Sequence, residues 1–476
     1  MIATERLAFT GEGISPSRTR GTSVEAGSSD VPESVTSPSS ARERKDRPAY
    51  NLLLFFIFVL MFRPQDDLRF LDPLHLAEVS GTLAVLSLVG GRMSRGRRIV
   101  APAPELFLVL GLAAWMLVTA PFSVWPGGAV GIFTDLFSKV LVVFALIMNT
   151  VTTRDRFEKL VMVIGAGTSY MAFRAVANYL QGINLVEGNR IAGAGGLFGN
   201  PNDMALNMVA FLPLAIVIAL MRRGAVARAI GVIGVPFIAL AIVFTKSRGG
   251  MIGLVVMVAV FLYKVRRVRP GLAGAIVLAC IASVPMLPES FTSRMSSIVN
   301  PEEDPTGSRA ARKELLKEAY HTFLEHPAFG IGAGQFMNYS PEARTRYVAW
   351  RETHNAPLQV AAELGVPGLV LFVSIIWCGF AAARIAARTL RARAPAARTR
   401  PQRRGPRGEH ERFTMYAAGF TASLAGWFVA ALFASVAYYW TLYLVLGLAV
   451  ALRDIVNADV QGPPAAPVPV RPRWKR

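Results

Sequence analysis

The sequence predicts an all-α protein that crosses a membrane about twelve times. Hydrophobic residues make up 53% of the 476 residues and charged residues only 17%, whereas soluble domains carry about 25% charged residues. The mean hydropathy is +0.41. Apolar runs recur along most of the chain, and many have about the 20 residues that a spanning helix needs.

Twelve apolar segments divide the chain into a membrane domain and two tails. The membrane domain covers residues 48–456, and the tails cover residues 1–47 and 457–476. The first tail is rich in Ser, Pro, Thr and Gly and the second in Pro and Arg, so we expect both to be disordered. The predicted spans are residues 48–63, 73–91, 104–121, 129–149, 158–180, 202–221, 225–244, 249–264, 270–288, 356–383, 413–434 and 437–452.

Lys and Arg are distributed unevenly between the loops, and this distribution predicts the topology. They gather in the N-terminal tail and in every second loop after it, whereas the short loops between carry few. Cytoplasmic loops of membrane proteins retain positive residues, so both termini are predicted to be cytoplasmic. The formal net charge of +20 then reflects topology, and we exclude nucleic acid as a partner.

Residues 289–355 form the only long loop on the non-cytoplasmic side. It ends at His354, where the chain re-enters the membrane. Apolar side chains at helical spacing predict an amphipathic helix that packs over the membrane domain like a lid. They are Leu315, Leu316, Ala319, Tyr320, Phe323 and Leu324.

Two cations, Lys246 and Arg248, stand between apolar spans on the non-cytoplasmic side, where topology disfavours them. Gly249 and Gly250 follow and let a backbone approach a ligand closely. A helix beginning there would direct its N-terminal dipole at an anion, and an Arg can hold two phosphate oxygens. We predict a pyrophosphate site, although both cations could instead reach toward lipid head groups.

Two further polar residues lie at the same membrane face. Arg190 occupies another short outer loop, and Asn202 lies where that loop enters a helix. Charges near bilayer depth are costly and are kept mainly for function. Asn202 has two interpretations, because an Asn at a helix start caps free N–H groups and can also contact a sugar or phosphate.

His354 is the candidate general base, because an unperturbed imidazole titrates near pH 6.5. It opens a polar stripe that continues through Asn355, Gln359 and Glu363 on one helix face. The two cysteines are isolated in apolar runs, and no HExxH or Cys/His cluster occurs. We therefore expect no metal site and no cofactor.

Four stretches in order resemble the O-antigen ligase and O-antigen polymerase superfamily, bacterial membrane glycosyltransferases of the C type. The resemblance covers roughly residues 185–375. Its motifs are Phe198-Gly199-Asn200-Pro201-Asn202-Asp203, Thr245-Lys246-Ser247-Arg248-Gly249-Gly250, His326-Pro327-Ala328-Phe329-Gly330-Ile331-Gly332-Ala333-Gly334, and Thr353-His354-Asn355 through Glu363-Leu364-Gly365-Val366-Pro367-Gly368.

The resemblance implies a metal-independent, inverting transfer at the periplasmic face of the inner membrane. The donor would be a glycan on undecaprenyl pyrophosphate, and the acceptor a hydroxyl of another glycan or of lipid A-core. His354 would be the base and Arg248 would hold the pyrophosphate, with Arg309 as a second arginine and Arg190 as a third. Membrane lipid, a flippase and a chain-length regulator are the other implied partners.

Three alternatives remain open at this stage. Ligases and polymerases share the motifs, so the sequence does not separate them. A metal-dependent glycosyltransferase that uses polyprenyl-phosphate sugars would place acidic residues in the first outer loop, where Asp66 and Asp67 lie. A non-enzymatic transporter would move glycan without any role for His354.

Overall fold

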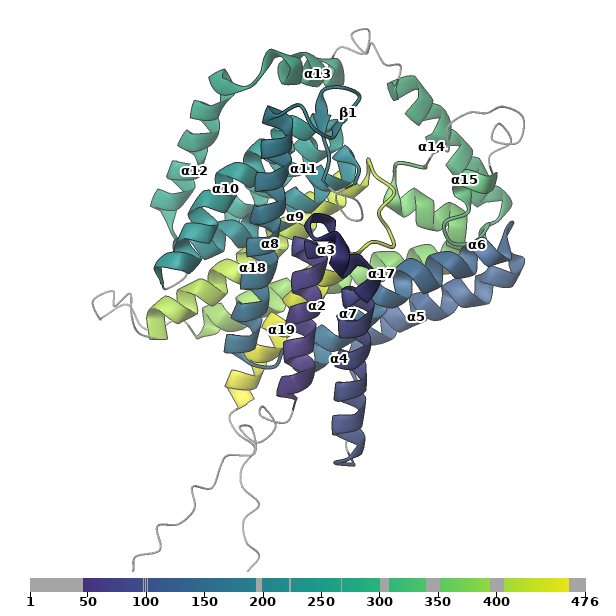
Figure 1. Ribbon diagram of the computed structural model, residues 1–476, viewed down its shortest axis with the longest axis horizontal. Helices are drawn as coiled ribbons and strands as arrows, with labels where there is room; N and C mark the ends of the chain where they lie inside the picture. The colour runs from purple at the N-terminus through teal and green to yellow at the C-terminus, as the bar shows by residue number, and fades with distance from the viewer. Residues whose placement is uncertain are drawn as a thin grey trace, which may run out of the picture.

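The computed structural model is almost entirely helical, as Figure 1 shows. It describes residues 46–461 except 97, 99, 101, 194–198, 222–223, 267, 300–307, 340–351 and 394–405. The predicted tails therefore lie outside the described residues, apart from their membrane-side ends, where helices α2 and α19 begin and finish.

The predicted fold class is confirmed: the chain is an all-α, multi-pass membrane protein. Ten helical stretches of the described residues are long and apolar enough to cross a membrane, α2 is a shorter apolar helix, and α12 with α13 forms a bent pair. These match the twelve predicted segments one to one. The main helices are α2 (Arg47–Phe62), α4 (Leu76–Met93), α5 (Pro104–Thr119), α7 (Ser138–Thr150), α8 (Arg154–Leu180), α9 (Pro201–Met221), α10 (Ala225–Thr245), α11 (Arg248–Val265), α12 (Pro270–Ser283), α13 (Glu289–Val299), α17 (Ala356–Ala392), α18 (Pro406–Ala431) and α19 (Trp440–Gln461).

Shorter elements connect these helices. The connection from α2 to α4 holds α3 and the 3-10 turn η1, and that from α5 to α7 holds η2, α6 and a π-helical turn, η3. A two-stranded hairpin joins α8 to α9. The bounds are α3 (Pro64–Asp67), η1 (Arg69–Leu74), η2 (Ala120–Phe122), α6 (Pro126–Gly131), η3 (Ile132–Phe137), β1 (Leu185–Val186), β2 (Arg190–Ile191), η5 (Val284–Met286), α14 (Ser308–Glu325) and α15 (Phe336–Tyr339).

Helices α9, α18 and α19 form the centre of the bundle, with 83%, 72% and 78% of their apolar windows buried. Helix α9 is apolar on all sides, as expected for a helix surrounded by other helices. Small residues allow close packing between α11 and α18: a Cβ added to Gly253 would lie 2.8 Å from the carbonyl oxygen of Gly426.

One predicted span is bent. Residues 270–288 were expected to form one helix, but α12 ends before η5, and α13 runs at 102° to it. None of the residues of α12 is buried, and Figure 1 shows α12 at the edge of the bundle. The chain turns where Pro288 precedes α13, a residue that cannot donate a backbone hydrogen bond to a continuing helix.

The two ends of the bundle differ in character. In Figure 1 the start of α2 and the end of α19 lie at one end, and the β1–β2 hairpin and α13 lie at the other. Ion pairs tie the helices together at the first end. Arg154 pairs with Glu409 and Asp459, Arg412 with Glu158, and Arg269 with Glu411.

Helix α14, in the long loop, packs on α17. Its buried positions are Leu315, Ala319 and Thr322, which follow the i, i+4, i+7 spacing of one helix face. The predicted amphipathic helix is therefore present, but its buried face is narrower than expected. Tyr320 and Leu324 were predicted on that face, and each is 53% exposed.

The glycine-rich segment after α14 wraps around a break in α17. Gly365 interrupts that helix with φ 65°, and Val366 donates its backbone N–H to Pro327 at 2.8 Å. Gly330, with φ 69°, lies so close that an added Cβ would be 2.3 Å from the backbone of Glu363. Only glycine fits this combination of positive φ and close approach.

Candidate active site

The junction between α10 and α11 brings two of the predicted segments together. Lys246 ends α10 in the left-handed conformation, and Ser247 caps α11 by accepting a hydrogen bond from the Gly250 N–H at 3.2 Å. Ser247 Oγ also donates to Asn202 Oδ1 at 2.9 Å. Asn202, at the start of α9, is thus bound to the α10–α11 junction.

Arg190 joins the same group from the β1–β2 hairpin. Its Nε donates to the carbonyl oxygen of Thr245 at 2.8 Å, and its Nη2 donates to Asn202 Oδ1 at 3.1 Å. A third nitrogen, Nη1, pairs with Glu187 at 3.3 Å. Arg190 is only 5% exposed. Burial of a charge is costly unless the charge is paired and hydrogen-bonded, and these contacts meet that requirement.

Two arginines of the long loop complete a cationic cluster, defined here as Arg190, Lys246, Arg248, Arg294 and Arg312. Arg248 Nε donates to the backbone oxygen of Arg294 at 3.4 Å. Burial lowers the pKa of Arg190 to about 10, and Arg294 and Arg312 add to the effect. Burial, Arg294 and Arg190 likewise lower the pKa of Lys246. Cations that depress one another's pKa favour an anion with several oxygens.

His354 lies at the end of the long loop, one residue before the Asn355 cap of α17. Its backbone is left-handed, with φ 50°, and its N–H donates to Ser435 Oγ at 2.9 Å. Burial lowers the pKa of the imidazole to about 4, and Arg312 contributes. His354 is therefore neutral at pH 7 and able to accept a proton. Arg312, which also acts on Arg190, links it to the cationic cluster.

The polar stripe that begins at His354 continues along α17 into the interior of the protein. Asn355 Oδ1 accepts the Leu358 N–H at 2.9 Å, which caps α17. One turn and two turns on, Gln359 and Glu363 are 8% and 2% exposed. Glu363 accepts hydrogen bonds from the Gly334 N–H and the Tyr438 hydroxyl, both at 2.8 Å. The stripe thus ties the glycine-rich segment to the α18–α19 connection behind His354.

A small cavity of about 80 Å³ lies beside this stripe. Its lining includes Glu352, Ser435, Tyr439 and the side of η3 that carries Ile132 and Leu136. Burial raises the pKa of Glu352. Burial, Asp203 and Glu352 together raise the pKa of Tyr439 to about 12. Thr353, the residue before His354, also lines this cavity, and its hydroxyls and carboxylates suit a hydroxyl-bearing ligand.

The sequence prediction of the site is met unevenly. Arg190, Asn202, Lys246 and Arg248 come together, and Arg312 couples His354 to them. The side chain of Arg309 lies outside the described residues, as does Phe198 of the first motif. The sequence analysis did not select Arg294, Arg312, Ser435 or Glu352. For Arg312 a signal existed, since it precedes Leu315 by three residues and Ala319 by seven, on the buried face of α14.

The acidic pair in the first outer loop is engaged by other residues. Asp66 pairs with Arg63 at 2.6 Å, and Asp67 pairs with Arg174 at 2.8 Å and accepts the Tyr170 hydroxyl at 2.9 Å. Over the described ranges, no three His, Cys, Asp or Glu side chains form a group suited to a metal ion.

Part of this site lies in a range of the chain that matches a known protein family. Residues 233–373 match the model of the O-antigen ligase family, a range that includes Lys246, Arg248, Arg312 and His354. The chain is 27% identical over 194 residues to the teichuronic acid biosynthesis protein TuaE of Bacillus subtilis (strain 168), a match that covers 38% of each chain. The chain thus spans well under half the length of this curated relative. The domain match and the relative thus make the chain similar to surface polysaccharide enzymes of the O-antigen ligase and polymerase type, and its helical membrane fold agrees with that similarity.

Proposed function

We propose that the protein transfers a glycan from undecaprenyl pyrophosphate to an acceptor hydroxyl at the periplasmic face of the bacterial inner membrane. The observation that carries the proposal is the hydrogen-bonded group at the α10–α11 junction, where Arg190 and Asn202 meet the segment that carries Lys246 and Arg248. Arg312 lies near enough to both Arg190 and His354 for its charge to lower their pKa values. This arrangement supplies a base for a hydroxyl and a site for a pyrophosphate, the two requirements of such a transfer.

The cationic cluster would bind the leaving group. In the proposed step, the acceptor oxygen forms a bond to the anomeric carbon while the bond from that carbon to the pyrophosphate oxygen breaks. The bonding electrons leave with undecaprenyl pyrophosphate, and attack from the opposite face inverts the anomeric configuration. Arg190 and Arg248 would neutralise the charge that develops on the leaving oxygens, so the proposal requires no metal ion.

His354 would take the proton of the acceptor hydroxyl. Its pKa of about 4 makes it available in the neutral form but weakly basic. A bound pyrophosphate would offset the charge of Arg312 and raise the pKa of His354. Donor binding would therefore make His354 a stronger base at the stage at which the acceptor hydroxyl must lose its proton.

The two ends of the bundle support one orientation of the protein in the membrane. The basic loops and the start of α2 share one end, and the candidate site lies at the opposite end. Retention of positive residues in the cytoplasm would place both termini inside and the site in the periplasm. A flippase that delivers the donor and a chain-length regulator are the partners that this orientation would suit.

The test uses the full-length protein in lipid nanodiscs, undecaprenyl-pyrophosphate-linked repeats and EDTA. We expect His354→Ala and Arg248→Ala each to lower the transfer rate about a hundredfold or more, as loss of a general base or of charge stabilisation does. Arg228→Ala is the matched control, because Arg228 is exposed near the opposite end of α10 from Thr245. Full activity in both site variants would refute the assignment.

Two further arms separate the alternatives. Product formed only with lipid A-core supports a ligase, and lengthening of the lipid-linked glycan without it supports a polymerase. The teichuronic acid role named for TuaE favours polymer formation. A metal-dependent enzyme would lose activity in EDTA and with Asp66→Ala while tolerating His354→Ala.

A further inference from the structure

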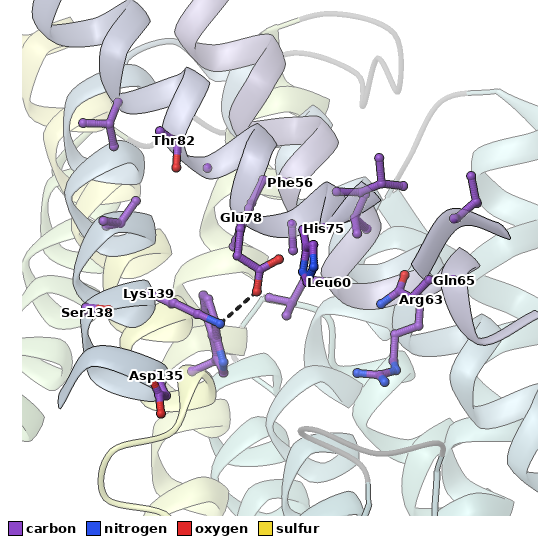
Figure 2. A pocket seen from close by; sticks show the side chains of 18 of the residues that line it. Phe56, Leu60, Arg63, Gln65, His75, Glu78, Thr82, Asp135, Ser138 and Lys139 are labelled. Atoms are coloured by element: carbon purple, nitrogen blue, oxygen red, sulfur yellow. Dashed lines mark hydrogen bonds and ion pairs between the residues drawn. The ribbon is translucent and has the colours of Figure 1, made fainter. Parts of the chain in front are cut away.

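A second, larger cavity lies outside the candidate active site. It has a volume of about 680 Å³ and is formed by α2, η1, α4, η3 and α7, with Trp440 at the start of α19. Figure 2 shows its lining side chains. The cavity contains none of the candidate site residues and lies outside the range that matches the O-antigen ligase family.

The deeper walls of this cavity are apolar. Phe56, Val59 and Leu60 line it from α2, and Val85 and Leu86 from α4. Leu86 is 61% exposed, so the cavity reaches the outer surface of α4, where a membrane protein meets lipid. A hydrocarbon chain could enter from the side.

The rim is polar but has no excess of positive charge. Lys139 pairs with Glu78 at 2.9 Å, as the dashed line in Figure 2 marks, and Arg63 pairs with Asp66 at 2.6 Å. Asp135 and Asp72 add two carboxylates to the lining. This balance differs from that in the cationic cluster, so the rim does not select a phosphate, and recognition at this cavity would rest on the sugar and the hydrocarbon chain of the ligand.

Further hydrogen-bonding groups complete the rim. Ser138 and His75 line it, as does Gln65, whose Oε1 is buried and finds no hydrogen-bond partner among the described residues. A buried acceptor without a donor is costly unless a ligand supplies one. The hydroxyl groups of a sugar are such donors, and they suit the carboxylates and amides of this rim. An aromatic side chain such as Trp440 suits the apolar face of a sugar.

The cavity adjoins the acceptor side of the active site. The same π-helical turn, η3, contributes Ile132 and Leu136 to the small cavity beside His354 and Asp135 to the large one. Likewise, Tyr438 and Tyr439 line the small cavity and Trp440 lines the large one. These two segments therefore contribute to the lining of both cavities.

We propose that the large cavity binds a lipid-linked saccharide, with its hydrocarbon chain along the apolar walls and its sugar hydroxyls at the rim. Binding of this class of ligand follows from the cavity itself. That the ligand is the acceptor in glycan transfer rests on the proposed function. The lipid could be a polyprenyl pyrophosphate or another glycolipid anchor, and the shared chemistry is a saccharide on an apolar chain.

The binding test uses dodecyl maltoside with a diazirine in its alkyl chain, added to the full-length protein in nanodiscs and activated by light. Mass spectrometry should place the cross-links on α2, α4 and α7. Thr82→Trp and Ser138→Trp fill the cavity from two helices and should each reduce labelling about tenfold. Leu83→Trp is the matched control, since Leu83 is exposed on α4 and does not line the cavity, and it should label like the parent protein.

Competition distinguishes the sources and the alternatives. Labelling is repeated with an excess of polyprenyl-pyrophosphate-linked saccharide and, separately, with an excess of lipid A-core. A loss of labelling with either competitor supports the proposal and identifies the lipid anchor. Equal labelling of the two cavity variants and the parent would overturn it. So would competition by dodecylphosphocholine as strong as that by dodecyl maltoside, which would indicate a site for any lipid.

A separate arm keeps this proposal distinct from the proposed function. Labelling of the Arg248→Ala variant should equal that of the parent, because the cavity does not include Arg248. In a transfer assay, Thr82→Trp should raise the KM for the acceptor about tenfold while leaving the KM for the donor unchanged. Labelling without any transfer activity would reject the function and retain the binding site.

Discussion

The backbone N–H of His354 donates a 2.9 Å hydrogen bond to the hydroxyl of Ser435. Thr353 shares the same hydroxyl at 3.0 Å, so one buried side chain of the α18–α19 connection holds the end of the long loop. His354 has a left-handed backbone, a conformation that a non-glycine residue adopts at some cost. The Ser435 contact offsets part of that cost and holds the backbone that carries the imidazole.

Ser435→Ala should lower kcat about tenfold, because leaving buried groups without a hydrogen-bond partner costs about 1–3 kcal/mol. The KM for the lipid pyrophosphate donor should not change, since Ser435 has no contact with the cationic cluster among the described residues. Ser435→Thr keeps the hydroxyl and should restore most of kcat. Steady-state kinetics of the three proteins check this, and an unchanged kcat in the alanine variant would contradict the positioning role.

Arg312→Gln should move the acidic limb of the pH profile to higher pH. His354 must be neutral to act as a base, and with a pKa of about 4 the value of kcat/KM should rise through about pH 4 and then level off. Removing Arg312 removes a charge that lowers this pKa, so the limb should shift upward. The measurement is kcat/KM between pH 4 and 8.

The position of the limb, rather than the height of the profile, is the readout for Arg312→Gln, because the variant also weakens the cationic cluster. Lys313→Gln changes the same charge one residue away on the exposed side of α14 and should leave the limb in place. Identical profiles for the Arg312 variant and the parent would show that His354 does not sense Arg312.

Gly330→Ala should destabilise the protein by several kcal/mol, because an added Cβ would collide with the backbone of Glu363 at 2.3 Å and would sit at φ 69°. Thermal unfolding in detergent should show a lower midpoint. Gly274→Ala is the control, since an added Cβ at Gly274 in α12 meets nothing within 4 Å. A Gly330→Ala midpoint equal to that of the control would contradict the tight contact.

The proposed orientation can be tested with cysteine labelling. In a background with Cys280→Ser and Cys378→Ser, Lys317→Cys on α14 and Ser94→Cys after α4 place single exposed thiols at opposite ends of the bundle. A membrane-impermeant maleimide should label the Lys317→Cys protein in intact spheroplasts. It should label the Ser94→Cys protein only after lysis, and the reverse pattern would invert the topology.

Hydropathy predicts the fold well because the bilayer imposes a length and an apolar composition on each span. It does not predict the bend between α12 and α13, since composition carries no information on direction. The face of α14 was also only partly predictable. Tyr320 and Leu324 fit a helical period, but the surface of α17 that α14 contacts is narrow, and tertiary packing selects Leu315 and Ala319.

The sequence selects candidate site residues where they stand in a local motif. Arg248 and His354 stand in recognisable stretches, and Arg190 is conspicuous as a cation in an outer loop. Ser435 and Arg294 act only through contacts between distant parts of the chain, at sequence separations of 81 and 46 residues. Their neighbours in sequence carry no sign of these contacts.

The break in α17 at Gly365 anchors the last part of the long loop to that helix. Three backbone hydrogen bonds hold the segment after α14 to α17. They run from Ile331 to Ala362, from Gly332 to Glu363 and from Val366 to Pro327, and they would break if this segment moved together with α14. Any rotation of α14 that widens the approach to His354 must therefore pivot before Pro327. The resulting force would act on α17 at the break, about three turns from His354.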